Sequence, residues 1–147
     1  MIKDRVGLPK AVEFIERKLL SFDTSKVKYI SLNEKNTADV LHGKCYFPSK
    51  KANRTMYHMT AAVNPHINFP ATHTHWGRIP DTSFKQGWRS GEAIYRFNNV
   101  EEAAVHVLAH EIAHFLLREK QIKEKNVEAN CNMVADQWLE EYRKENE

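Results

Sequence analysis

At 147 residues, the chain has the length of a single domain with one sizeable hydrophobic core. Its 41% hydrophobic and 28% charged residues are typical of a folded globular protein and exclude a disordered or fibrous one. The net charge of +3 is too low to predict nucleic-acid binding by itself. The first 123 residues nevertheless carry +7, which keeps a nucleic-acid partner open as an alternative.

No apolar run is long enough for a membrane-spanning helix, and the residues that follow Met1 lack the apolar segment of a signal peptide. The two cysteines, Cys45 and Cys131, lie far apart in the sequence and form no disulfide framework. This sparse cysteine usage is typical of a reducing compartment. We therefore expect a cytoplasmic protein with no membrane partner.

The predicted elements follow the order helix, strands, two helices. Apolar residues at three- and four-residue spacing predict an amphipathic helix over 8–22. Short runs rich in β-branched and aromatic residues predict strands over 27–32, 44–47, 55–63 and 93–97. An Asn99 cap with Glu102 three residues later predicts the start of a helix that runs through Leu116, and a final helix is expected over about 127–142.

Residues 64–91 differ from the rest, because they hold three of the five prolines and three of the five glycines together with His66, His73 and His75. We expect an ordered loop with room for a hairpin, since long connections in compact domains are usually functional. The sequence thus predicts one α+β domain over 1–147. Residues 1–98 would form a helix and a small mixed or antiparallel sheet of three to four strands, and residues 99–147 the helical half.

The chemistry-bearing motif is His110-Glu111-Ile112-Ala113-His114, an H-E-x-x-H pattern within the helix that Asn99 opens. Residues four apart on a helix return to within about 40° of each other and rise by about 6 Å, so the two imidazoles can bind one ion. Glu111 is offset from both histidines and suits a metal-bound water better than the metal. The pattern predicts a zinc hydrolase with His110 and His114 as ligands and Glu111 as general base.

A tetrahedral catalytic zinc takes a third ligand from the protein and leaves its fourth position to water. The downstream candidates are Glu128, Cys131 and Asp136. Glu128 lies 14 positions after His114, which leaves enough chain for one helix to end and the next to return. Cys131 follows it by three residues and would share its helix face, so the spacing leaves the third ligand open.

These residues resemble the gluzincin metallopeptidases, especially their compact single-domain members. In that family a glutamate on the helix after H-E-x-x-H completes the zinc site, often within E-x-x-A-[DN]-x-x-A. Glu128, Cys131, Asn132 and Ala135 stand at those places, with Cys131 where alanine is usual. The resemblance covers residues 99–139 and implies that Glu128 binds zinc and that Asn132 hydrogen-bonds a zinc histidine. It also implies that a strand of the small sheet pairs with extended substrate.

Peptide hydrolysis also needs a donor to the oxyanion that forms when water attacks the carbonyl. His73, His75 and Tyr95 are the candidates, since the first two lie in the long connection before the H-E-x-x-H helix and the third in the strand leading to it.

The sequence therefore predicts a zinc-dependent metallopeptidase that holds one Zn²⁺ per chain and hydrolyses a peptide or protein substrate. His110, His114 and Glu128 would bind the metal, and Glu111 would activate the zinc-bound water. Substrate choice is expected to depend on residues 64–91. The alternative is a zinc-bearing module that binds nucleic acid or protein with little or no proteolytic turnover.

Overall fold

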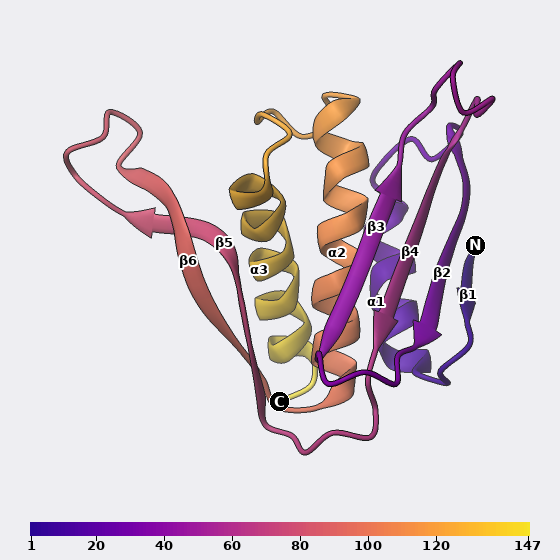
Figure 1. Cartoon of the computed structure of the whole chain (residues 1–147), viewed down its shortest axis with the longest axis horizontal. Coiled ribbons are helices and arrows are strands. Elements are labelled where there is room, and N and C mark those ends of the chain that lie inside the picture. The colour runs from indigo at the N-terminus through magenta and orange to yellow at the C-terminus, as the bar shows by residue number, and fades with distance from the viewer.

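The computed structural model describes all 147 residues as three helices and two sheets, an α+β domain (Figure 1). In chain order the elements are β1 (Ile2–Asp4), α1 (Pro9–Leu19), β2 (Val27–Glu34), β3 (Leu41–Tyr46), β4 (Tyr57–Val63), β5 (Ala71–Pro80), β6 (Trp88–Phe97), α2 (Val100–Arg118) and α3 (Glu128–Glu145).

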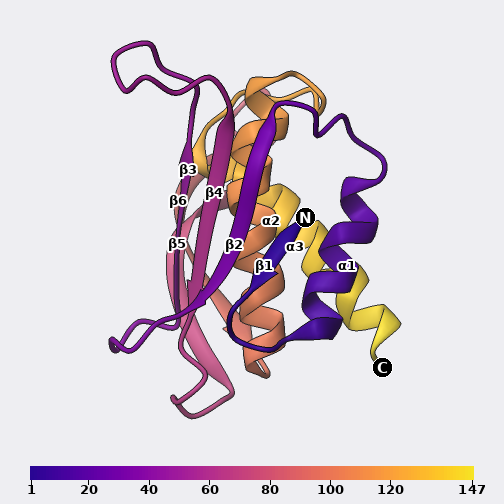
Figure 2. The ribbon, with the colours of Figure 1, turned by 90° about the vertical axis from the view of Figure 1, so that its right-hand side faces the viewer.

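The larger sheet is mixed, with strand order β1-β2-β4-β3. β1, β2 and β4 are parallel, and β3 runs antiparallel to β4 at the edge of the sheet. The side chains of β2 and β4 that point to the helical side are buried and apolar, whereas their neighbours on the opposite side are more polar. All three helices lie on one side of this sheet (Figure 2).

Helix α2 is the centre of the core, because 15 of its 19 residues are buried. It packs on β3 and β4, on α1 and on α3. Asn99 caps its first turn as expected, since the Asn99 side chain accepts a hydrogen bond from the Glu102 backbone N–H at 2.9 Å. A helix buried on every side holds its side chains in fixed positions, which suits it to carry a site. No helix of the chain is long and apolar enough to cross a membrane.

β5 and β6 form a separate antiparallel hairpin that packs against α3 and extends away from the main sheet (Figure 1). The ordered loop expected over 64–91 therefore contains the hairpin for which it left room, and the residues 71–80 and 88–91 within it are strand rather than loop. Thr72-His73-Thr74-His75-Trp76 alternates between the two faces of β5, a strand pattern that the surrounding prolines and glycines hide. The strand expected over 93–97 likewise begins earlier, at Trp88, because it pairs with the whole of β5.

The other boundaries differ by a few residues. The expected strand over 44–47 begins at Leu41, and the last helix spans Glu128–Glu145 rather than 127–142. β1 was not expected, because a three-residue strand carries too little pattern to be recognised. The first helix, the strands within 27–34 and 55–63, and the H-E-x-x-H helix lie where the sequence predicts them.

Candidate metal centre

His110, Glu111 and His114 lie in the middle of α2 and line a cleft of about 430 Å³. One wall of the cleft is β3, the other is β5, and the first turns of α3 close it from the side. The rings of His110 and His114 have centroids 5.0 Å apart, as the four-residue spacing predicts. The two imidazoles therefore open into the same volume.

Glu128, the first residue of α3, lies directly opposite the two histidines. Its Oε2 lies 2.9 Å from His110 Nε2, and its Oε1 lies 3.2 Å from His114 Nε2. Hydrogen bonds from these histidines, and from His75, hold the pKa of the Glu128 carboxyl far below its usual range. The carboxylate is therefore ionised and aimed between the two rings.

These three side chains could together hold a zinc ion. Two ligands at about 2.0–2.2 Å from a tetrahedral zinc lie about 3.3–3.6 Å apart, close to the separations of the Glu128 oxygens from the histidine nitrogens. Two imidazoles and a carboxylate are also a donor set that zinc accepts in hydrolases. A modest outward movement of the carboxylate would accommodate the ion.

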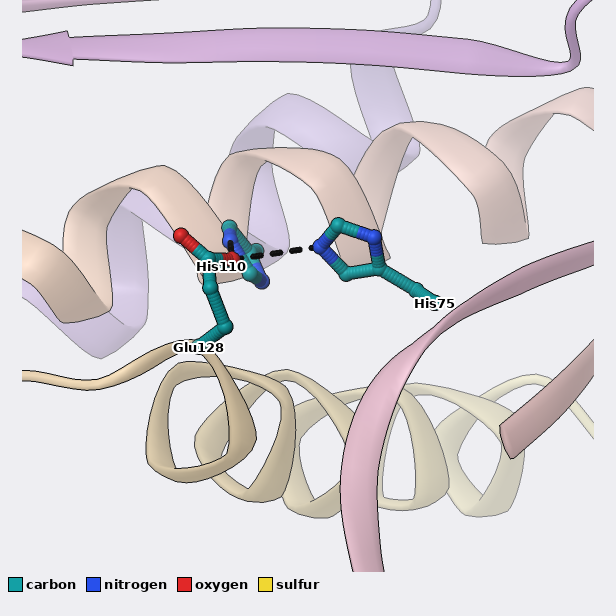
Figure 3. Close-up of side chains that lie close together, drawn as sticks. All are labelled: His75, His110 and Glu128. Atoms are coloured by element: carbon teal, nitrogen blue, oxygen red, sulfur yellow. Dashed lines mark hydrogen bonds and ion pairs between the residues drawn. The ribbon is translucent and has the colours of Figure 1, made fainter. Parts of the chain in front are cut away.

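His75 on β5 reaches the same volume from the opposite wall (Figure 3). Its Nε2 lies 3.1 Å from the Glu128 oxygen that also contacts His110. The donor atoms of His75, His110 and Glu128 all lie within 4.8 Å of one another, as do those of His110, Glu111 and His114. The hairpin thus supplies a third imidazole next to the pair on α2.

The far nitrogens of His110 and His114 are each held by an asparagine amide. His110 Nδ1 lies 2.7 Å from Asn132 Oδ1, and His114 Nδ1 lies 2.8 Å from Asn126 Oδ1. An amide oxygen only accepts, so both rings donate from Nδ1 and present Nε2 toward Glu128. The Asn132 amide is oriented in turn because its nitrogen donates to the Trp76 carbonyl of β5. Asn132 was expected near a histidine, whereas Asn126 was not singled out because it lies in the connection before α3.

Glu111 lies beneath the edge strand β3. A Cβ added to Gly43 would lie 2.4 Å from Glu111 Oε2, so the glycine leaves the room that the carboxylate fills. Burial raises the pKa of Glu111, and the nearby His110 and His114 only partly oppose this effect. A carboxylate with a raised pKa binds a proton more readily, as a general base requires.

The alternative third ligands lie elsewhere. Cys131 Sγ is 3.3 Å from Nδ1 of His114, on the side of the ring away from Glu128, and Asp136 pairs with His106 Nε2 at 2.9 Å.

His73 lines the cleft, and burial lowers its pKa. The ring of Tyr95 lies 4.8 Å from that of His106 and is not part of the cleft lining. Of the three proposed oxyanion donors, the structure thus brings His75 nearest to the histidine pair.

No family model, curated protein or solved structure matches this chain.

Proposed function

We propose that this chain is a zinc-dependent metallopeptidase whose metal ligands are His110, His114 and Glu128. The observation that carries the proposal is the meeting of two imidazoles from α2 with a carboxylate from α3 beside Glu111, in one cleft. A bound zinc ion would polarise water and the substrate carbonyl. The site is built from two helices of the core, so its donors are preorganised.

Glu111 is the general base of the proposed reaction. It takes a proton from the attacking water and delivers it to the amine that leaves when the peptide bond breaks. Its burial supports this role, because desolvation makes the carboxylate more basic. Asn132 and Asn126 keep the histidine rings turned toward the reaction volume throughout.

The edge of β3 is the proposed substrate platform. Along an antiparallel strand, every second residue bonds to the neighbouring strand and the residues between them direct their backbone groups away from it. The Asn64 N–H donates to the Val40 carbonyl, so Val40 and every second residue after it bond to β4. Leu41, Gly43 and Cys45 therefore direct their backbone N–H and C=O groups away from β4, toward the open edge. An extended peptide paired with this edge would pass over Glu111, since Gly43 lies next to that carboxylate.

We assign the oxyanion donor to His75, because its Nε2 faces the histidine pair from the wall opposite β3. Loss of one such donor typically lowers kcat by about 10²–10³-fold. His75→Ala should therefore lower kcat by that amount with the zinc content unchanged. Loss of zinc from this variant would instead make His75 a metal ligand.

The proposal is tested by metal analysis together with two substitutions. Wild-type protein should carry one zinc per chain and cleave members of a fluorogenic peptide library, and Glu111→Gln should keep the zinc while losing about 10²–10⁴-fold in rate. Glu128→Gln should weaken zinc binding by more than about 100-fold, because loss of an outer partner alone costs about 10–100-fold. Glu140→Gln, which alters an exposed carboxylate of the same helix, is the matched control.

Failure to bind zinc after reconstitution would exclude the metal site. A Glu111→Gln variant that cleaves the library as fast as wild type would exclude the mechanism. Stoichiometric zinc with no cleavage of any peptide would favour the alternative, a zinc-bearing binding module.

A further inference from the structure

The outer face of the four-stranded sheet carries no covering element. All three helices lie on the other side (Figure 2), and the hairpin packs on α3. Apart from Ala62, the side chains that β1 to β4 direct outward are polar or aromatic. The face is therefore a surface of the folded chain that lies on the other side of the sheet from the cleft and meets it only at the edge strand β3, where Lys44 also lines the cleft.

Three aromatic rings cross this face in one row. Tyr29 on β2, His58 on β4 and Tyr46 on β3 stand opposite one another in the strand register. The rings of Tyr29 and His58 are stacked, with centroids 4.9 Å apart and planes 6° apart, and the rings of His58 and Tyr46 are 4.3 Å apart. Tyr29 is 36% exposed, and β1 pairs with β2 only from Ile30 onward. The stack therefore has an open end at Tyr29.

The next row of the sheet pairs small hydroxyl side chains with two lysines. Across the sheet from β1 to β3, this row reads Lys3, Ser31, Thr60 and Lys44, each paired with the next in the strand register. The two hydroxyl residues form a low floor, and an exposed lysine borders it on either side. Lys3, Ser31 and Thr60 line a shallow hollow together with Arg5, Tyr29 and Asn33.

Cations surround both rows without acidic partners. Lys44 Nζ lies 4.9 Å from the centre of the Tyr46 ring, and Arg54 Cζ lies 5.2 Å from it. No ion pair involves these two side chains, and none involves Lys3, Arg5 or Lys28. A second hollow is lined by Tyr46, His58 and Arg54, and no Asp or Glu lines either hollow.

The Nη1 atom of Arg54 is buried and has no hydrogen-bond partner. A buried guanidinium nitrogen normally finds an acceptor, so this donor is unused by the protein and would reach an anion once the Arg54 side chain turns outward from the Tyr46 ring. Five unpaired cations around an aromatic stack thus match the two parts of a nucleotide, a phosphate and a flat base.

We propose that the outer sheet face binds single-stranded nucleic acid. An unpaired base continues the stack by lying on Tyr29, and phosphates of the strand contact Lys3 and Arg5 on one side and Lys44 and Arg54 on the other. A single strand is the occupant because bases within a duplex are stacked on one another and cannot reach the ring. This inference goes beyond the proposed peptidase and does not depend on it.

Fluorescence anisotropy with a labelled 12-nucleotide strand of mixed sequence, made as RNA and as DNA, tests the proposal on the full chain. Wild type should bind the single strand at least tenfold more tightly than a duplex of the same length. Tyr29→Ala should weaken binding roughly tenfold, since stacking of one base contributes about 1–3 kcal/mol, and Tyr29→Phe should retain it. Comparison of the RNA and DNA arms shows which sugar the face prefers.

The charge contribution is tested by the salt dependence of the affinity. Each phosphate contact to a single strand contributes about 0.7 to the slope of log K against log salt, so the double variant Lys3→Gln/Arg5→Gln should lower the slope by about 1.4. Lys10→Gln/Lys123→Gln removes two exposed, unpaired lysines elsewhere on the surface and should leave the slope unchanged.

Absence of binding, equal affinity for the duplex, or a Tyr29→Ala variant that binds like wild type would each overturn the proposal. Binding that persists after zinc chelation and in Glu111→Gln would support a site separate from the cleft, whatever the outcome for peptide hydrolysis. A circular dichroism spectrum and a urea unfolding midpoint equal to those of wild type would show that Tyr29→Ala is folded.

Discussion

Substitution of Gly43 by alanine tests the link between the edge strand and the general base. The new Cβ would lie 2.4 Å from Glu111 Oε2 and 2.8 Å from its Cδ, whereas ordinary van der Waals contact begins at 3.4 Å. Gly43 does not have a positive φ, so alanine is compatible with the backbone there. The carboxylate must therefore withdraw by about 1 Å, or β3 must move outward.

A displacement of about 1 Å at a reacting group typically lowers the rate by about 10²-fold. We therefore expect Gly43→Ala to lower kcat/KM by about 10²-fold while the protein still binds one zinc, because the three atoms nearest the new methyl group all belong to Glu111 and none to a proposed metal ligand. The assay is cleavage of the fluorogenic library, with metal content measured on the same sample.

Gly91→Ala is the matched control. Its new Cβ would also meet side chains at 2.8 Å, but these belong to Arg89 and Ile79, which do not line the cleft. Its activity should stay within about twofold of wild type, since the chemistry is untouched. Wild-type turnover by Gly43→Ala would refute the placement of the reaction between Glu111 and the edge of β3.

Three further predictions follow from individual contacts. Asn132→Ala should weaken zinc binding by about 10–100-fold in a metal-competition titration, because His110 loses the acceptor that fixes its ring. Burial opposes protonation of His114, but hydrogen bonds with Cys131 and Glu128 raise its pKa to about 11. The ring is therefore protonated in the metal-free protein at pH 7 and must lose a proton to bind zinc. Titration calorimetry in two buffers should show the release of about one proton per zinc. Burial acts to raise the pKa of Glu102, but hydrogen bonds from Arg143 and Asn98 outweigh it and lower the pKa. The stability from this carboxylate is therefore present at neutral pH and is lost as the pH falls through the lowered pKa. Glu102→Gln should reduce the free energy of unfolding by about 1.5–3 kcal/mol at pH 7 and by much less near pH 2. Urea titrations at the two pH values measure the difference.

The helical half of the chain was largely predictable because its signals are local. The apolar spacing, the Asn99 cap and the four-residue separation of His110 and His114 are properties of one helix, and the structure reproduces each of them. The α+β order was predictable for the same reason, since it depends only on which periodicity follows which along the chain.

The hairpin and its contribution to the site were harder to predict because they depend on pairing across the chain. The alternating pattern of β5 is local, but the glycines and prolines around it hide where the strand begins and ends. The approach of His75 to Glu128 follows from the packing of β5 on α3, which no spacing in the sequence encodes. Asn126 was missed for a related reason, since its role depends on how the connection before α3 turns back toward His114.

The unpaired edge of β3 also bears on how copies of this chain behave toward one another. A strand that offers free N–H and C=O groups to a substrate offers them equally to the same strand of a second copy, the usual starting point of edge-to-edge aggregation. His42 and Lys44 are exposed on this strand, and a lysine in such a position disfavours docking of an identical edge. The positive charge of Lys44 does not repel acidic or neutral peptides. The edge of β3 therefore disfavours pairing with a second copy of itself but still allows other chains to pair with it.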